Sequence, residues 1–189
     1  MKTIIAIALA ISALCSVSLT QAQAQTKDEK KTIGQVVDSA TKRVEHDFVP
    51  AAEAMPEDKY SFAPTNGEFK GVRTFAEQIK HVAATNYLVA SLILGEKPPV
   101  EINDEKGPDS VKTKAEILKY LKDSYAYAHK AANSIDENNV LGMVQSPWGP
   151  NKVTRLGLSL IMVSHPFDHY GQMVEYLRMN GIIPPASRG

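Results

Sequence analysis

Four stretches of the sequence place apolar side chains at the three- and four-residue intervals of an amphipathic helix. They run from Thr32 to about Met55, Thr74 to about Gly95, Thr113 to about Ala132 and about Thr154 to Asn180. Such a stripe buries one face of a helix and leaves the other in water. No long stretch alternates polar and apolar residues as a half-buried strand would, and the best candidate is Val140–Gln145. The predicted fold class is therefore all-α.

Capping signals and loop residues mark where these helices begin and end. Thr74 with Glu77, and Thr113 with Glu116, each form the sequence pattern of a capping box. Gly181 is a natural residue to follow the last helix. The stretches between the helices are long and rich in Pro, Gly, Asn and Asp. We therefore expect a four-helix bundle with long connections, in which the order of the helices is not restricted to simple up-and-down.

The last helical stretch contains a proline, Pro166, which cannot donate a backbone hydrogen bond. Two alternatives follow for this stretch. Either the helix continues through Pro166 with a kink, or its regular part begins near Pro166, with the proline in the first turn.

The N-terminus predicts export. Met1-Lys2 is a short positive start, an apolar run follows to Leu19, and Ala22-Gln23-Ala24 fits the small-x-small pattern of signal peptidase. We expect a signal peptide over 1–24 and a domain over 25–189, in the periplasm or secreted, without stable membrane insertion after cleavage. The alternative, an uncleaved anchor, is disfavoured because the run is short for a membrane span.

The charge balance and the single cysteine exclude several classes of chemistry. Lys plus Arg and Asp plus Glu both number 21, so no basic excess points to nucleic acid. The one cysteine, Cys15, lies inside the predicted signal peptide. The mature chain then has no disulfide, no cysteine nucleophile and no cysteine ligand for a metal.

Two histidines four residues apart are the strongest chemical signal in the chain. His165 and His169 leave one face of the last helix about one turn apart. His81, on the second helix, has small and polar neighbours and is a candidate for the third ligand. Three neutral imidazoles suit Zn²⁺ or Ni²⁺ and leave a position open for water or substrate. His46 is expected at the surface, and His129 at the edge of its helix's apolar stripe.

Polar residues near these histidines are candidates for orienting them. Asp168, Glu77 and Gln78 lie within a turn of a candidate ligand and would fix an imidazole tautomer. The spacing alone does not decide whether these histidines bind a metal, since Pro166 stands where an H-E-x-x-H metalloprotease motif has glutamate. The alternative is a plain bundle in which hydrogen bonds at a helix interface satisfy the histidines.

Three segments resemble the DinB-like (damage-inducible, YfiT-related) family over nearly the whole mature chain. They are Ala54–Tyr60, Phe75–Ala83 and His165–Leu177. The resemblance implies a four-helix bundle that binds a divalent metal through His81, His165 and His169. It also implies a homodimer. Some members of the family are metal-dependent transferases or isomerases that use low-molecular-weight thiols, and many have no assigned activity.

The functional prediction is therefore an exported metal-binding protein that acts as a metal-dependent transferase or hydrolase on a small molecule. A thiol cosubstrate fits poorly with export. The alternative function is a non-enzymatic bundle in which the metal is structural or is itself the ligand.

Overall fold

The structure, a computed structural model, describes residues 30–188 and contains the four expected helices. They are α2 (Ile33–Ala54), α3 (Phe75–Leu94), α4 (Lys114–Asn133) and α5 (Arg155–Met179). Shorter elements are η1 (Glu57–Lys59), β1 (Met143–Gln145), β2 (Lys152–Thr154) and η2 (Pro185–Ser187). The predicted four-helix bundle is confirmed. The predicted signal peptide and Cys15 lie outside the described residues.

A threonine caps the start of every long helix. The side chains of Thr32, Thr74, Thr113 and Thr154 each accept a hydrogen bond from the backbone N–H three residues on. The two predicted capping boxes are present: the Glu77 and Glu116 carboxylates reach back to the N–H groups of Thr74 and Thr113. These caps satisfy backbone donors that have no partner within the helix, which explains why the helix starts are readable from the sequence.

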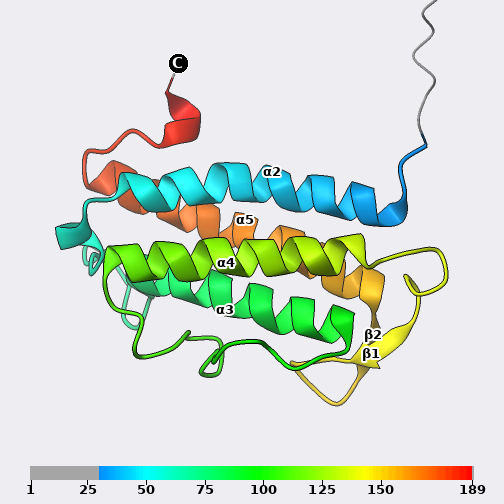
Figure 1. Ribbon diagram of the computed structural model, residues 1–189. Coiled ribbons are helices and arrows are strands. Elements are labelled where there is room, and N and C mark those ends of the chain that lie inside the picture. Colours follow the sequence, from blue (N-terminus) through cyan, green and yellow to red (C-terminus); the bar gives the residue numbers. More distant parts are fainter. Residues whose placement is uncertain (1–29, 189) are drawn as a thin grey trace, which may run out of the picture. The chain divides into compact units, whose positions relative to one another are not determined.

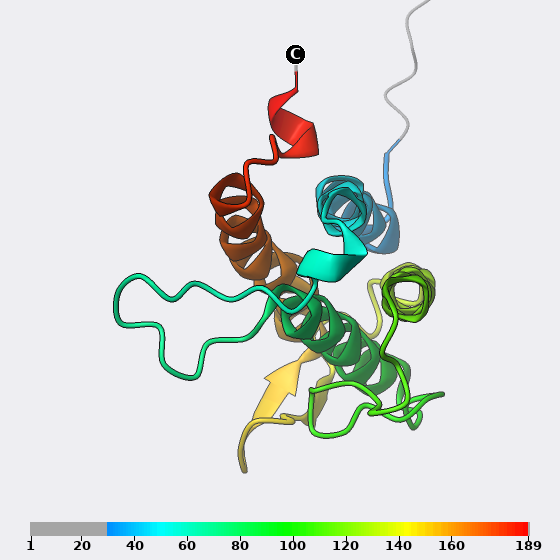
Figure 2. The same ribbon diagram turned by 90° about the vertical axis from the view of Figure 1, so that its left-hand side faces the viewer.

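The order of the helices differs from a simple up-and-down bundle. α2 and α3 are diagonal, and each packs against both α4 and α5. The ammonium group of Lys114 donates to the carbonyl of Met55, and the Ala76 N–H donates to the carbonyl of Tyr60. α3 and α4 therefore both begin near the end of α2 and run parallel (Figure 1). Residues 95–113 make the long return between them (Figure 2).

The seam between α3 and α5 has a polar layer between two apolar clusters. One cluster includes Phe75 and Ile79 of α3 with Met173 of α5. The other includes Val89 of α3 with Leu158 and Met162 of α5. Between these levels the facing positions carry polar side chains: Gln78, His81, His165 and His169. The apolar packing on both sides holds the two backbones at a fixed separation around this layer.

Two element boundaries that the sequence left open are defined by the structure. α5 begins at Arg155 and continues through Pro166, so a start near Pro166 is wrong. The Thr154 cap sets the start, and the proline removes only one hydrogen bond, to the Met162 carbonyl. Of the best strand candidate, Val140–Gln145, only Met143–Gln145 forms a strand, β1, which pairs antiparallel with β2. β2 was not predicted, because three residues are too few to establish an alternation.

Within residues 30–188, no helix has both the length and the apolar content needed to cross a membrane.

Candidate metal centre

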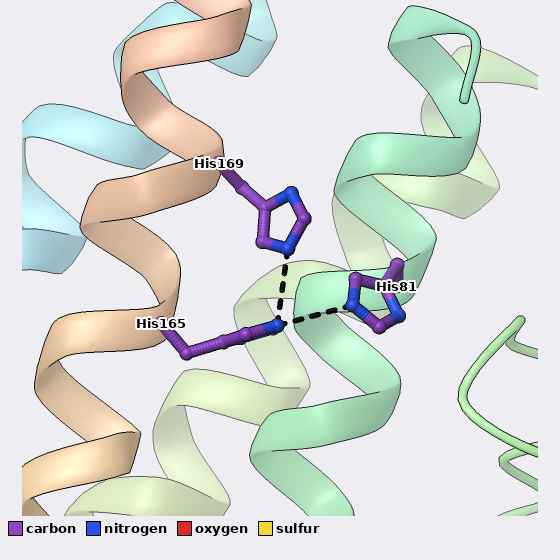
Figure 3. A group of neighbouring side chains, drawn as sticks. All are labelled: His81, His165 and His169. Carbon is purple, nitrogen blue, oxygen red and sulfur yellow. Dashed lines mark hydrogen bonds between the residues drawn. The ribbon is translucent and has the colours of Figure 1, made fainter. Parts of the chain in front are cut away.

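Three histidines from two helices meet in the polar layer between α3 and α5. The Nε2 atom of His165 lies 3.0 Å from Nε2 of His81 and 3.0 Å from Nε2 of His169 (Figure 3). One ring nitrogen from each histidine lies within 4.8 Å of the other two. The structure thus brings together the three residues that the sequence singled out. That they bind a metal stays a prediction.

All three rings are withdrawn from water. His81 and His169 are each only 6% exposed, and His165 is partly buried. Burial lowers the pKa of His165 to about 3 and that of His169 to about 4, and nearby histidines and Arg73 add to the effect. Burial also lowers the pKa of His81, against an opposing hydrogen bond to Glu105. The imidazoles are therefore neutral at physiological pH, which is the form that binds metal ions.

Hydrogen bonds at Nδ1 fix which nitrogen of two rings carries the proton. The Nδ1–H of His81 donates to the backbone carbonyl of Glu105 at 2.8 Å. The Nδ1–H of His169 donates to the Gln78 side-chain oxygen. Because both acceptors need a proton on Nδ1, the Nε2 atoms of His81 and His169 carry lone pairs. Metal-binding histidines are typically oriented in this way.

A directed chain of hydrogen bonds supports the tautomer of His169. The Asp168 carboxylate accepts from the Gln172 amide nitrogen at 3.3 Å. The Gln172 oxygen then accepts from the Gln78 nitrogen at 2.8 Å, which turns the Gln78 oxygen toward His169. A carboxylate can only accept, so it sets the direction of every later bond in the chain.

The proton count around the three facing nitrogens favours a cation. His81 and His169 present lone pairs, and one proton on His165 Nε2 can be donated fully to only one of them. His165 Nδ1 is buried and has no hydrogen-bond partner among the described residues. Nitrogens bound at 2.0–2.1 Å to one tetrahedral ion stand about 3.3–3.4 Å apart. The two Nε2 pairs at 3.0 Å are close to this separation, and all three nitrogens lie within 4.8 Å of one another. The residues therefore fit a divalent ion.

The three candidate orienting residues have different roles. Gln78 contacts His169 directly, as expected, and Asp168 acts on it only through Gln172. The Glu77 carboxylate forms no hydrogen bond with any of the three clustered histidines among the described residues. It accepts instead from the backbone N–H and the hydroxyl of Thr74. The expectation for Glu77 is therefore wrong, because the capping role that marks the helix start uses this carboxylate.

Sequence reasoning missed Glu105, which acts through its backbone. Asn103, Asp104 and Glu105 have positive φ angles of 44°, 49° and 63°, an unfavourable conformation for side chains other than glycine. This turn presents the Glu105 carbonyl to His81, and the Glu105 carboxylate accepts from Trp148 Nε1 at 2.8 Å. A backbone carbonyl belongs to every residue type, so no residue pattern could have revealed this contact.

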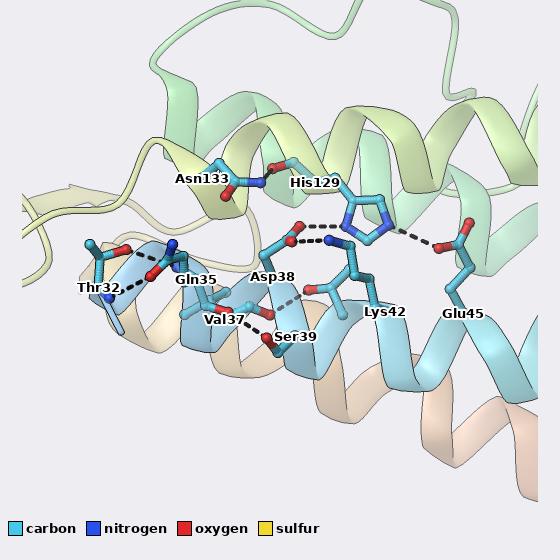
Figure 4. Close-up of polar contacts among 10 residues, drawn as sticks. Thr32, Gln35, Val37, Asp38, Ser39, Lys42, Glu45, His129 and Asn133 are labelled. Atoms are coloured by element: carbon cyan, nitrogen blue, oxygen red, sulfur yellow. Dashed lines mark hydrogen bonds and ion pairs between the residues drawn. The ribbon is translucent and has the colours of Figure 1, made fainter. Parts of the chain in front are cut away.

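The two remaining histidines lie elsewhere. The side chain of His46 is 86% exposed, which confirms the surface prediction. The side chain of His129, predicted at a boundary, is 21% exposed and lies between two carboxylates of α2 (Figure 4). Its nitrogens lie 2.7 Å from Asp38 and 2.9 Å from Glu45, so both are already engaged.

Solved structures share this fold. A conserved protein from Enterococcus faecalis superposes with a TM-score of 0.63 at 18% identity, over 79% of this chain and 98% of that one. A DinB-like protein from Bacillus cereus ATCC 10987 gives 0.63 at 17% identity, over 82% and 96%. YfiT from Bacillus subtilis, described as a probable metal-dependent hydrolase with an unusual four-helix bundle topology, gives 0.56 at 18% identity, over 82% and 92%.

A comparison with curated proteins finds no match. The family model of the DinB superfamily matches residues 40–173, a range that includes most of the bundle and all three clustered histidines. This match covers well over half of the sequence, and the helix arrangement agrees with it. The chain belongs to the DinB superfamily.

Proposed function

We propose that this protein is a metal-dependent hydrolase or transferase whose divalent ion, Zn²⁺ or Ni²⁺, is bound by His81, His165 and His169. The observation that carries the proposal is the convergence of three neutral imidazoles, two of which have their Nδ1 protons held by acceptors. The likeness to YfiT supports hydrolysis as the reaction to test first.

A divalent ion held by these three histidines would keep one position open, where it would polarise a substrate oxygen or lower the pKa of water, toward about 7 for zinc. The protein's own residues orient the ligands. Gln78 and the Glu105 carbonyl hold the rings of His169 and His81 with Nε2 facing inward. Apolar clusters flank this layer on both sides and pack the two helices around it.

The proposed location is outside the cytoplasm, on the strength of the signal-like residues 1–24. An oxidising compartment supplies little free low-molecular-weight thiol. We therefore favour hydrolysis of a small molecule over thiol transfer.

The test combines metal content with turnover. Purified protein is analysed for bound metal and then assayed, zinc- or nickel-loaded, against a panel of small ester, amide and phosphoester substrates. The matched variants are His165→Ala/His169→Ala, which removes two ligands, and His46→Ala, which removes an exposed histidine. We expect turnover that depends on metal and is lost only in the first variant. Metal-loaded protein that turns over no substrate would remove the support for an enzyme.

One observation favours a second candidate, a structural metal. The site is buried within the bundle, between the two apolar clusters of the α3–α5 seam. A metal that ties α3 to α5 would stabilise the fold without any reaction. This role predicts a large fall in melting temperature on chelation together with no turnover. An unchanged melting curve after chelation would contradict it.

A further inference from the structure

A cavity of about 600 Å³ opens beside the N-terminal end of α3, and its lining is strongly charged. The charged residues are Arg73, Glu77, Lys80, Lys106 and Asp109. They come from the loop before α3, from the first turns of α3 and from the long return between α3 and α4. Three are cationic and two anionic, so the partners of each decide which sign is presented to a ligand.

Both carboxylates and one of the cations have partners within the fold. Glu77 accepts from the backbone and hydroxyl of Thr74. Asp109 accepts from the Asn103 side chain at 3.2 Å.

The Lys80 ammonium donates to the Pro108 carbonyl at 2.8 Å. The side chains of Arg73 and Lys106 make no hydrogen bond or ion pair with any of residues 30–188. Arg73 and Lys106 are thus the two cations of the lining whose side-chain donors have no partner among the described residues.

The lining of the cavity adjoins the histidine cluster along the chain. Lys80 lines the cavity, and the next residue, His81, belongs to the cluster. Glu77 lines the cavity, and the next residue, Gln78, accepts a hydrogen bond from His169. Lys106 lines the cavity, and its neighbour Glu105 supplies the carbonyl that holds His81. Arg73 is anchored to α5, because its carbonyl accepts from the Tyr176 hydroxyl at 3.1 Å. The residues that line the cavity are therefore direct sequence neighbours of residues that form or hold the three-histidine site, although no histidine lines the cavity itself.

We propose that Arg73 and Lys106 bind the anionic group, a carboxylate or a phosphate, of the substrate whose reacting end meets His81, His165 and His169. The fork of the Arg73 guanidinium suits the two oxygens of either group, and Lys106 adds a second charge. That the bound anion belongs to a substrate rests on the proposed function. Anion binding in the cavity does not, and can be measured without turnover or metal.

The experiment is calorimetric titration of the full protein with inorganic phosphate and, separately, with acetate. It is run with zinc bound and again after chelation. The test variant is Arg73→Gln/Lys106→Gln. Its matched control is Arg43→Gln/Lys97→Gln, which removes the same two charge types from exposed positions. The fluorescence emission of Trp148, the only tryptophan, gives a second readout. Its indole N–H donates a hydrogen bond to the carboxylate of Glu105, the residue before Lys106.

We expect at least one of the two anions to bind with and without zinc. Its affinity should fall at least about tenfold in the test variant and stay within about twofold in the control, because charge-assisted hydrogen bonds are lost only in the test variant. The preferred anion identifies the group recognised. Zinc content should be unchanged in the test variant, so a failure of the cavity is distinguishable from a failure of the metal site.

Three results would overturn the proposal. The first is that neither anion binds at concentrations up to tens of millimolar. The second is that both double variants weaken binding equally. The third is that binding is lost when zinc is removed and is unchanged in the test variant, which would place the anion on the metal. Protein that binds phosphate through Arg73 and Lys106 but never binds zinc would support the cavity and contradict the proposed function.

Discussion

The bundle contains two buried or partly buried histidine environments that differ in what faces each ring. On the α3–α5 seam, His165 faces the ring nitrogens of His81 and His169 at 3.0 Å. On the α2–α4 seam, His129 faces the carboxylates of Asp38 and Glu45 at 2.7 and 2.9 Å. Imidazoles in the same bundle thus face lone pairs on one seam and negative charge on the other.

The difference shows that neighbouring groups, more than spacing, decide the chemistry of a histidine. Both nitrogens of His129 are engaged with carboxylates of α2, so neither is directed at a shared metal position. Burial acts to raise the pKa of Asp38, but hydrogen bonds from Lys42 and His129 outweigh it and the pKa is lowered. Among residues 30–188, no carboxylate forms a hydrogen bond with a ring of the histidine cluster, so burial keeps the cluster neutral and available to a cation.

Removing ligands from each environment should give the largest contrast. His165→Ala/His169→Ala is expected to abolish metal binding, because one imidazole cannot hold a divalent ion that three bind. His129→Ala should retain the full metal content, because that ring lies on the other seam, with both nitrogens engaged by carboxylates. Elemental analysis after dialysis measures both. Equal metal retention in the two variants would show that the metal is bound elsewhere.

Changing the hydrogen bonds around the cluster should weaken binding without abolishing it. Gln78→Leu removes the acceptor for His169 Nδ1, and loss of such a partner typically lowers metal affinity about 10- to 100-fold. Gln172→Leu leaves that contact in place and removes only the next bond, so its effect should be smaller. Competition with a chromophoric chelator gives the two affinities. A larger loss in Gln172→Leu would contradict the directed chain.

The α2–α4 seam should respond in stability instead of metal binding. Asp38→Asn removes the charge that Lys42 and His129 share, and should lower the free energy of unfolding by about 1–3 kcal/mol. Asp47→Asn is the matched control, because Asp47 pairs with the exposed His46 and should change stability by less than about 0.5 kcal/mol. Urea unfolding measures both. A metal affinity that fell in Asp38→Asn would remove the distinction between the two seams.

The pH dependence of stability should differ between the seams as well. The cluster's histidines have folded pKa values below the unfolded value near 6.5, so the unfolded chain takes up protons first as the pH falls. Metal-free protein should lose up to about 1.4 kcal/mol per pH unit for each such histidine, from pH 6.5 toward 4. The contribution of Asp38, whose pKa is lowered, persists through this window and is lost only as the pH falls further.

Urea titrations at several pH values measure this slope. It should be shallower in His165→Ala/His169→Ala than in the unaltered chain. An identical slope in both would mean that the cluster is protonated in the folded protein.

The sequence predicted the parts of the fold that local chemistry controls. Threonine caps and apolar stripes mark the helix starts, because a cap and a stripe act within a few residues. The parallel pairing of α3 with α4 was not predicted, because it depends on how residues 95–113 return along the bundle. The histidines at 81, 165 and 169 were identified by residue type and family resemblance. The Glu105 carbonyl was not, because its role depends on a strained turn instead of a side chain.

X-ray absorption spectroscopy of zinc-loaded protein tests the central claim most directly, because it reports the atoms bound to the metal. We expect three imidazole nitrogens at about 2.0–2.1 Å and one exchangeable oxygen ligand, with the imidazole signal lost in His165→Ala/His169→Ala. A coordination shell of carboxylate oxygens alone, or a spectrum unchanged in that variant, would contradict a metal centre built from His81, His165 and His169.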